Sequence, residues 1–193
     1  MRARVRTFEV RSCAGMVGAW LLAAMLAAPG WAQGVSAPER VVKAVFLYKF
    51  LNYAEWPAAA FPDVEAPYVI GVLNADDVAQ ELVQLAADRV VDGRRVQVRR
   101  VKRGDSLAGL HLLFVAAADS KDLAALARQA QANAVLLVSE DPRAVRLQSA
   151  INLVVDEGKV RFDVAPDIAE KAGVRLSSRL LAVARSVRTP AEP

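Results

Sequence analysis

The single histidine has the widest chemical repertoire of any residue in this sequence of 193 amino acids. His111 could serve as the base of a hydrolase triad with Ser177 or Ser178, or it could bind a metal ion. Neither serine lies in a nucleophile-elbow motif. Because the only cysteine is Cys13, a zinc site would need carboxylates for most of its ligands, which is uncommon. We therefore predict a hydrogen-bonded or capping histidine at the start of a strand, with no catalytic residue, no metal ion and no cofactor.

Carboxylate pairs are the second group of residues with chemical potential. Asp76 and Asp77 follow an apolar run, which is where phospho-receiver domains carry an acidic pair. A receiver also needs an aspartate at the end of a middle strand. At that position this chain has FVAAADS, in which three alanines follow the strand and Asp119 lies too far along the chain to take the place of the aspartate. We therefore predict that Asp76 and Asp77 stabilise a helix N-terminus and that Asp156 and Glu157 form a turn.

The periodicity of apolar residues predicts the elements that position these side chains. Apolar runs predict strands at 68–74, 96–101, 111–117 and 134–139, and a β-hairpin at 151–164. Helical patterns and capping residues predict helices at 38–54, 75–88, 121–132, 166–172 and 177–187. Strands separated by helices favour a mostly parallel sheet. We predict an α/β fold: a single three-layer-like domain whose mostly parallel, mixed sheet is flanked by helices and ends in a C-terminal β-hairpin and a closing helix.

Five of the twelve aromatic residues lie in one segment, FLYKFLNYAEWP. Phe46, Phe50 and Tyr53 recur at helical spacing and are predicted to pack a first helix against the sheet. Tyr48 and Trp56 are the exceptions, because aromatic residues are also enriched at interfaces. We predict that these two residues line a self-association face or a small-molecule pocket.

The first 32 residues have the three parts of a secretory signal peptide. A basic start precedes an uncharged apolar stretch at 13–28, and Gly30-Trp31-Ala32 places small residues for cleavage before Gln33. A membrane anchor is the alternative, but this stretch is shorter than the about 20 residues that a spanning helix needs. We predict a cleaved signal peptide at 1–32, a periplasmic protein and one domain at 33–193.

Removal of the signal changes what the composition implies. The full chain has 25 basic and 21 acidic residues, and the loss of four arginines and one glutamate with residues 1–32 leaves 21 and 20. A net charge of +1 gives no indication of nucleic-acid binding. Cys13 leaves with the signal, so no disulfide or thiol chemistry is expected.

The C-terminal part of the chain combines alternating strands with charged residues. In the run VRFDV, the apolar residues alternate with Arg161 and Asp163, which places these two charged side chains on the opposite face. A solvated outer face is one interpretation of this pattern. The other is a partner-binding surface, since arginine is a typical interface anchor; its predicted residues are Arg161, Asp163, Arg175 and Arg179.

Two segments of the sequence resemble the YfiR/HmsC family of exported proteins. The first is VKAVFLYKFLNYAEWP, an aromatic-rich helix that ends in Trp-Pro. The second is INLVVDEGKVRFDVAPDIAEKAGVRLSSRLLAVARSV. The resemblance covers nearly all of the chain after the signal, although the middle agrees mainly in the order of its elements. Characterised relatives use cysteine pairs, which this chain lacks after residue 32, so redox control is not carried over.

The resemblance implies a periplasmic repressor without enzymatic activity. Family members bind the periplasmic sensor domain of an inner-membrane GGDEF diguanylate cyclase and hold it inactive, which lowers cyclic di-GMP and the output of biofilm or exopolysaccharide. Some members also respond to an outer-membrane OmpA-like lipoprotein, and members tend to self-associate, so a homodimer is expected. The alternative that the residues leave open is a periplasmic small-molecule-binding sensor, with a concave site near Trp56 and the strand ends.

Overall fold

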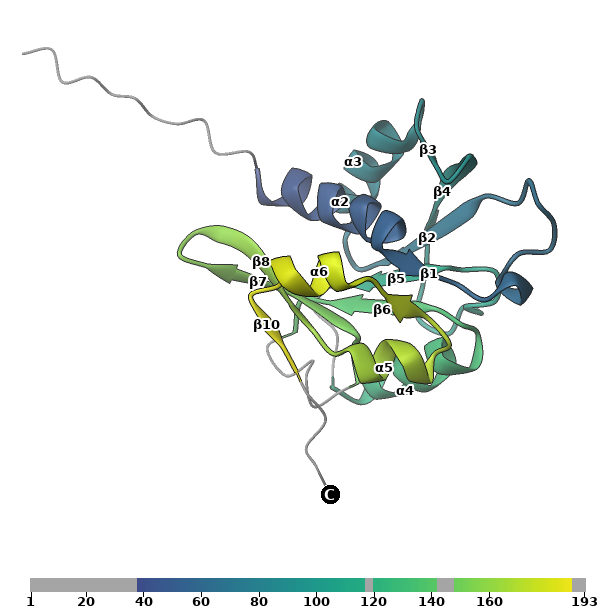
Figure 1. Cartoon of the computed structure of the whole chain (residues 1–193). Helices are drawn as coiled ribbons and strands as arrows, with labels where there is room; N and C mark the ends of the chain where they lie inside the picture. Colours follow the sequence, from purple (N-terminus) through teal and green to yellow (C-terminus); the bar gives the residue numbers. More distant parts are fainter. Residues whose placement is uncertain (1–37, 117–119, 142–147, 189–193) are drawn as a thin grey trace, which may run out of the picture. The chain divides into compact units, whose positions relative to one another are not determined.

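Strands and helices alternate along most of the computed structural model, which describes residues 38–116, 120–141 and 148–188 (Figure 1). The described residues belong to one unit, Ala37–Pro193. The predicted signal peptide at 1–32 lies outside the described residues.

The central sheet is mixed and mostly parallel, as predicted. Its strands are β2 (Tyr68–Leu73), β3 (Val90–Val91), β4 (Arg94–Arg100), β5 (Leu112–Val115), β6 (Leu136–Ser139), β7 (Ile151–Asp156), β8 (Lys159–Val164) and β10 (Ser186–Val187). Their spatial order is β10-β8-β7-β6-β5-β2-β4-β3. Only the β7–β8 and β3–β4 pairs are antiparallel, and the first of these is the predicted C-terminal hairpin.

Helices cover both faces of the sheet, which confirms the predicted three-layer α/β arrangement. They are α2 (Glu39–Phe50), α3 (Asp76–Ala86), α4 (Ser120–Ala132), α5 (Pro166–Lys171) and α6 (Ser178–Val183). One buried cluster joins the sheet to α2, α3, α5 and α6, and a second joins its other face to α4. Among the described residues, no helix combines the length and the apolar character that crossing a membrane requires.

The order of the parallel strands creates a switch point. Along the chain they occur as β2, β4, β5, β6 and β7, but in space β2 lies between β4 and β5. The chain therefore runs from β2 through α3 to one side, and then returns past β2 to β5. In doubly wound sheets of this order, ligands bind outside the carboxyl ends of the two strands at the switch point.

The predicted first helix is shorter than its apolar pattern suggests. The pattern extends to residue 54, but α2 ends at Phe50 and is followed by a 3-10 turn, Leu51–Tyr53. The next two residues form β1 (Ala54–Glu55), which pairs with β9 (Arg175–Leu176). Pairing with a distant segment therefore ends the helix before Trp56-Pro57 does.

The closing helix is also shorter than predicted. The helical pattern extends to residue 187, whereas α6 ends at Val183 and Ser186–Val187 pairs with β8 as β10. The Ser177 hydroxyl caps α6 by accepting the N–H of Leu180, as predicted. Pairing of β10 with β8 supplies the backbone hydrogen bonds that residues 186–187 would otherwise make in a longer helix. The end of α6 is therefore set by a contact with a distant strand.

Candidate functional site

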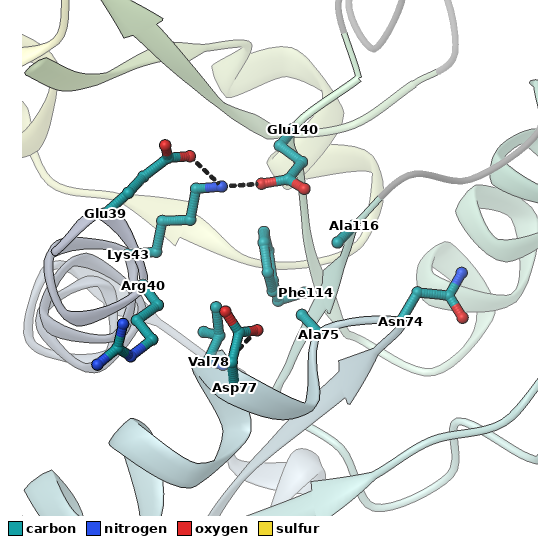
Figure 2. Close-up of a pocket in the computed structure, with 10 residues that line it drawn as sticks. All are labelled: Glu39, Arg40, Lys43, Asn74, Ala75, Asp77, Val78, Phe114, Ala116 and Glu140. Atoms are coloured by element: carbon teal, nitrogen blue, oxygen red, sulfur yellow. Dashed lines mark hydrogen bonds and ion pairs between the residues drawn. The ribbon is translucent and has the colours of Figure 1, made fainter. Parts of the chain in front are cut away.

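A hollow lies at the switch point, at the carboxyl ends of β2, β5 and β6 (Figure 2). Its volume is about 360 Å³. It is lined by side chains from α2, from the connection between β2 and α3, and from the ends of β5 and β6: Glu39, Arg40, Lys43, Asn74, Ala75, Asp77, Val78, Phe114, Ala116 and Glu140. This position makes the hollow the candidate functional site.

Lys43 connects α2, on one side of the hollow, to the end of β6 in the sheet. Its ammonium lies between two carboxylates, with Glu39 at 2.6 Å in the same helix and Glu140 at the end of β6 (Figure 2). Burial alone would lower the pKa of Lys43, but the hydrogen bonds and charges of Glu140 and Glu39 outweigh it and the pKa is raised. A second hollow of about 440 Å³ shares these three side chains and extends over β7.

The acidic pair at the start of α3 acts within the fold. The Asp77 carboxylate accepts the N–H of Val78 at 2.8 Å, and Asp76 pairs with Arg100 of β4 at 3.0 Å. Both lie in the first turn of the helix, as predicted. The residue after β5 is Ala116, so the hollow has no carboxylate at the position where a phospho-receiver needs one; Asp119 lies outside the described residues.

The hollow offers charged groups that can bind a ligand. Three carboxylates and two cations surround a floor formed by the buried ring of Phe114. The residues that the structure describes contain no group of three or more side chains suited to hold a metal ion. A small polar or charged molecule is the ligand that such a site suits.

His111 is enclosed within the core, where only 2% of its surface is exposed. Its Nδ1 accepts the N–H of Val69 at 3.1 Å, and its carbonyl accepts the indole N–H of Trp56 at 3.0 Å. The predicted hydrogen-bonded histidine at the start of a strand is therefore confirmed. Its Nε2 atom makes no hydrogen bond of normal geometry among the described residues, although the Ala60 carbonyl interacts with the ring and favours its protonated form.

Aromatic rings keep His111 neutral. Phe61 stacks on the imidazole with ring centroids 4.5 Å apart, and Tyr68 meets it edge-on at 5.2 Å. Burial lowers the pKa of His111 to about 4, the Ala60 carbonyl partly opposes this shift, and the charge of Arg94 adds to it. The imidazole is therefore uncharged at neutral pH.

Tyr48 and Trp56 lie away from the hollow. Tyr48 is buried, and its hydroxyl donates to the carbonyl of Val90 at 3.2 Å. Trp56 is half-buried beside Tyr68 and His111, at the amino ends of β2 and β5. The hollow is at the carboxyl ends of the same strands, so the structure does not bring Trp56 and the hollow together.

Three of the four residues predicted to form a partner-binding surface are exposed arginines. Arg161 lies in β8, Arg175 in β9 and Arg179 in α6. Arg175 pairs with the carboxylate of Glu55 at 2.7 Å, across the β1–β9 pair. The guanidinium groups of Arg161 and Arg179 have no side-chain partner within the described ranges.

The fourth residue, Asp163, is 9% exposed and belongs to an internal ion pair. It accepts hydrogen bonds from Nε of Arg185 and from Oγ of Ser186, each at 2.8 Å. Burial alone would raise the pKa of Asp163, but these hydrogen bonds outweigh it and hold the pKa below its usual range. Its carboxylate therefore fastens β10 to β8.

Three residues of the hollow carry a partial signal in the sequence, although none of them was predicted as a site residue. Glu39 and Lys43 have the i, i+4 spacing of a helical ion pair. Glu140 directly follows a predicted strand, where side chains at the carboxyl edge of a parallel sheet gather. Their meeting depends on the spatial order of the strands, which local patterns do not specify.

Comparisons with known proteins agree with this fold. A solved structure, described as a conserved domain protein from Vibrio cholerae O1 biovar El Tor strain N16961, is similar with a TM-score of 0.52 and 16% sequence identity. The similarity covers 77% of this chain and 60% of that one, so the chain spans less than two thirds of the solved structure. No curated protein sequence matches the chain. The model of the YfiR/HmsC-like family matches residues 40–185. The chain therefore belongs to the YfiR/HmsC-like family.

Proposed function

We propose that this protein is an exported periplasmic regulator that binds the periplasmic sensor domain of an inner-membrane GGDEF diguanylate cyclase and holds the enzyme inactive. The match to the YfiR/HmsC-like family over residues 40–185 carries this proposal. The predicted signal peptide at 1–32 supports export. In this proposal the protein acts by binding and has no enzymatic activity of its own.

Repression requires a difference in affinity between two states of the cyclase. A ligand shifts an equilibrium only as far as it binds one state more tightly than the other. The protein therefore binds the inactive sensor domain more tightly than the active one, and cyclic di-GMP falls. Capture of the protein by an outer-membrane OmpA-like lipoprotein would remove it from the cyclase and restore activity. Self-association as a homodimer belongs to the same proposal.

Arg161, Arg175 and Arg179 supply the cyclase-binding surface in this proposal. Their guanidinium groups are exposed, and arginine is enriched at the energetic centres of interfaces. Asp163 stays outside the surface because it is only 9% exposed and its carboxylate is bound to Arg185 and Ser186, whereas Arg175 stays exposed beside Glu55. Loss of the three arginines should therefore weaken binding without unfolding the protein.

Deletion of the gene in its native host should raise cellular cyclic di-GMP. The wild-type gene should restore the low level, whereas a version without residues 1–32 should fail because it stays in the cytoplasm. The triple variant Arg161→Ala, Arg175→Ala, Arg179→Ala should also fail, with binding to the cyclase sensor domain weakened by about tenfold or more. The measurement is cyclic di-GMP by mass spectrometry, with an immunoblot for the periplasmic amount of each version.

A matched triple variant separates this surface from a general effect of charge. Lys49, Lys102 and Arg128 are also exposed cations, and replacing all three with alanine changes the net charge by the same amount. This variant should repress as wild type does. If both triple variants behave alike, or if deletion leaves cyclic di-GMP unchanged, the proposed surface or the proposed role is wrong.

The hollow at the switch point favours a second candidate function, a periplasmic sensor of a small polar molecule. Trp56 lies at the opposite strand ends, so its fluorescence is a poor reporter of this site. Thermal stability is a better one, because a ligand at a hundred times its dissociation constant stabilises the folded state by about 2.7 kcal/mol.

A metabolite screen should find a compound that raises the melting temperature through the hollow. Ala116→Leu, which fills part of the hollow, and Lys43→Met, which removes its ammonium, should each abolish that rise. Ala132→Leu makes the same alanine-to-leucine change as Ala116→Leu, but at an exposed position in α4. This variant should keep the increase in melting temperature. A compound that stabilises all of these variants equally would bind elsewhere.

A further inference from the structure

One edge of the central sheet is open along most of β4. β3 pairs only with Arg94 and Arg95, whereas Val96–Arg100 pairs with β2 on the other side (Figure 1). Within the described parts of the chain, no strand pairs with the outer edge of β4 beyond Arg95. Five consecutive residues of β4 therefore have a free edge.

The open edge presents unpaired backbone groups. The N–H of Val101, the residue after β4, donates to the carbonyl of Val72 in β2 at 2.8 Å. Backbone groups alternate in direction along a strand, so Val98 and Arg100 turn their N–H and C=O groups away from β2. An added strand could pair with these groups, as extended peptides do at exposed sheet edges.

A groove runs beside this edge and is lined on its far side by the end of α3. Its volume is about 860 Å³, and four consecutive residues of β4, from 95 to 98, form one wall. Val83 and Val90 line it and are 49% and 59% exposed. The groove therefore offers apolar contacts for alternate side chains of an added strand.

The charge of this edge selects the partner. β4 has the sequence RRVQVRR, with four arginines and no acidic residue. Arg100 is paired with Asp76 and Arg94 lies over the ring of Phe61, so Arg95 is the arginine of the strand that lines the groove. Arg95 of the strand and Arg89 beside the groove are exposed and have no side-chain partner within the described ranges. Asp88 lines the groove as well, so the three charged lining residues, Asp88, Arg89 and Arg95, leave a net charge of +1. A second copy paired at this edge would bring the same arginines close to one another. Charged side chains on an edge strand oppose such pairing between copies.

We propose that the open edge of β4 and the groove beside it bind an extended acidic segment of a partner protein, which adds to the sheet as a further strand. Backbone hydrogen bonds from Val98 and Arg100 fix the segment. Its acidic side chains meet Arg89 and Arg95, and its alternate apolar side chains enter the groove. This surface is separate from Arg161, Arg175 and Arg179, so its test is independent of the proposed cyclase repression.

Fluorescence anisotropy with two labelled peptides tests the proposal on the purified protein. The acidic alternating peptide EVEVEVE should bind, and its basic counterpart KVKVKVK should not. Arg95→Glu and Arg89→Glu should each weaken binding of the acidic peptide by about tenfold. Arg128→Glu on α4 makes the same change of charge at an exposed position away from the groove, and should have no such effect.

A backbone variant separates strand addition from simple charge attraction. Val98→Pro removes an N–H that turns away from β2, and edge strands tolerate proline at such positions. This variant should keep its far-ultraviolet circular dichroism and lose most of its affinity for EVEVEVE. Absence of binding by the wild-type protein, equal weakening by Arg128→Glu, or unchanged binding by a folded Val98→Pro variant would each overturn the proposal. A wild-type dimer that Val98→Pro dissociates would also overturn it, in favour of a second copy as the occupant.

Discussion

Replacement of Phe162 by alanine should lower the free energy of unfolding by about 3–5 kcal/mol, which is the usual cost of removing a buried phenylalanine. Phe162 is buried in β8, and its ring meets those of Phe46 and Phe50 edge-on, with centroids 5.4 Å and 5.2 Å apart. These three rings fasten α2 to the C-terminal hairpin. Urea unfolding followed by circular dichroism measures the loss.

The cost should belong to the buried ring rather than to any change in the hairpin. Val155 lies in the neighbouring strand β7 and is 57% exposed. Val155→Thr keeps the β-branched shape, and should change the free energy of unfolding by less than about 0.5 kcal/mol. A loss below about 1 kcal/mol for Phe162→Ala would show that α2 and the hairpin are not held together by these rings.

The sequence predicts the central fold because most of its elements are encoded locally. The apolar runs of β2, β5 and β6 read directly as buried strands, and their separation by helices predicts a mostly parallel sheet. The turn of the C-terminal hairpin is also local, since Glu157 and Gly158 both adopt positive φ angles, 49° and 72°. Such angles fit the two-residue turns that join antiparallel strands.

Local patterns fail where a distant partner decides the structure. The helical pattern continues past Phe50 and past Val183, yet at both places the chain leaves the helix to pair with another strand. Asp163 shows the same limit. Alternation places it opposite Phe162, on the face expected to meet solvent, but β10 pairs with β8 at that position, and Arg185 and Ser186 bind its carboxylate.

The hollow was beyond prediction for the same reason. Its place follows from the position of β2 between β4 and β5, which no local pattern specifies. Lys43 reads in the sequence as part of an exposed helical ion pair with Glu39, a pair of small energetic value. In the structure Lys43 also pairs with Glu140 at the end of β6, and the two side chains line the hollow together.

Acidification should destabilise the protein through His111. The pKa of this imidazole is about 4 in the folded protein, whereas a free histidine has a pKa of about 6.5. Between these two values the unfolded chain binds more protons than the folded protein, so stability falls as pH falls. The contribution of His111 is complete above about pH 6.5, is lost progressively toward pH 4, and amounts to at most about 3 kcal/mol.

Comparison with a variant isolates this contribution from the carboxylates, which also titrate near pH 4. His111→Asn does not titrate, and its side-chain oxygen can accept the N–H of Val69 in place of Nδ1. The variant should be less stable than wild type at pH 7.5, because its smaller side chain leaves space beside Phe61 and Tyr68. Its free energy of unfolding should then fall less steeply between pH 6.5 and pH 4.5, so the two curves converge. Parallel curves would mean that His111 is protonated in the folded state as readily as in the unfolded one. In that case the aromatic rings around it would not exclude the charge, and the acid sensitivity of the protein would come from its carboxylates.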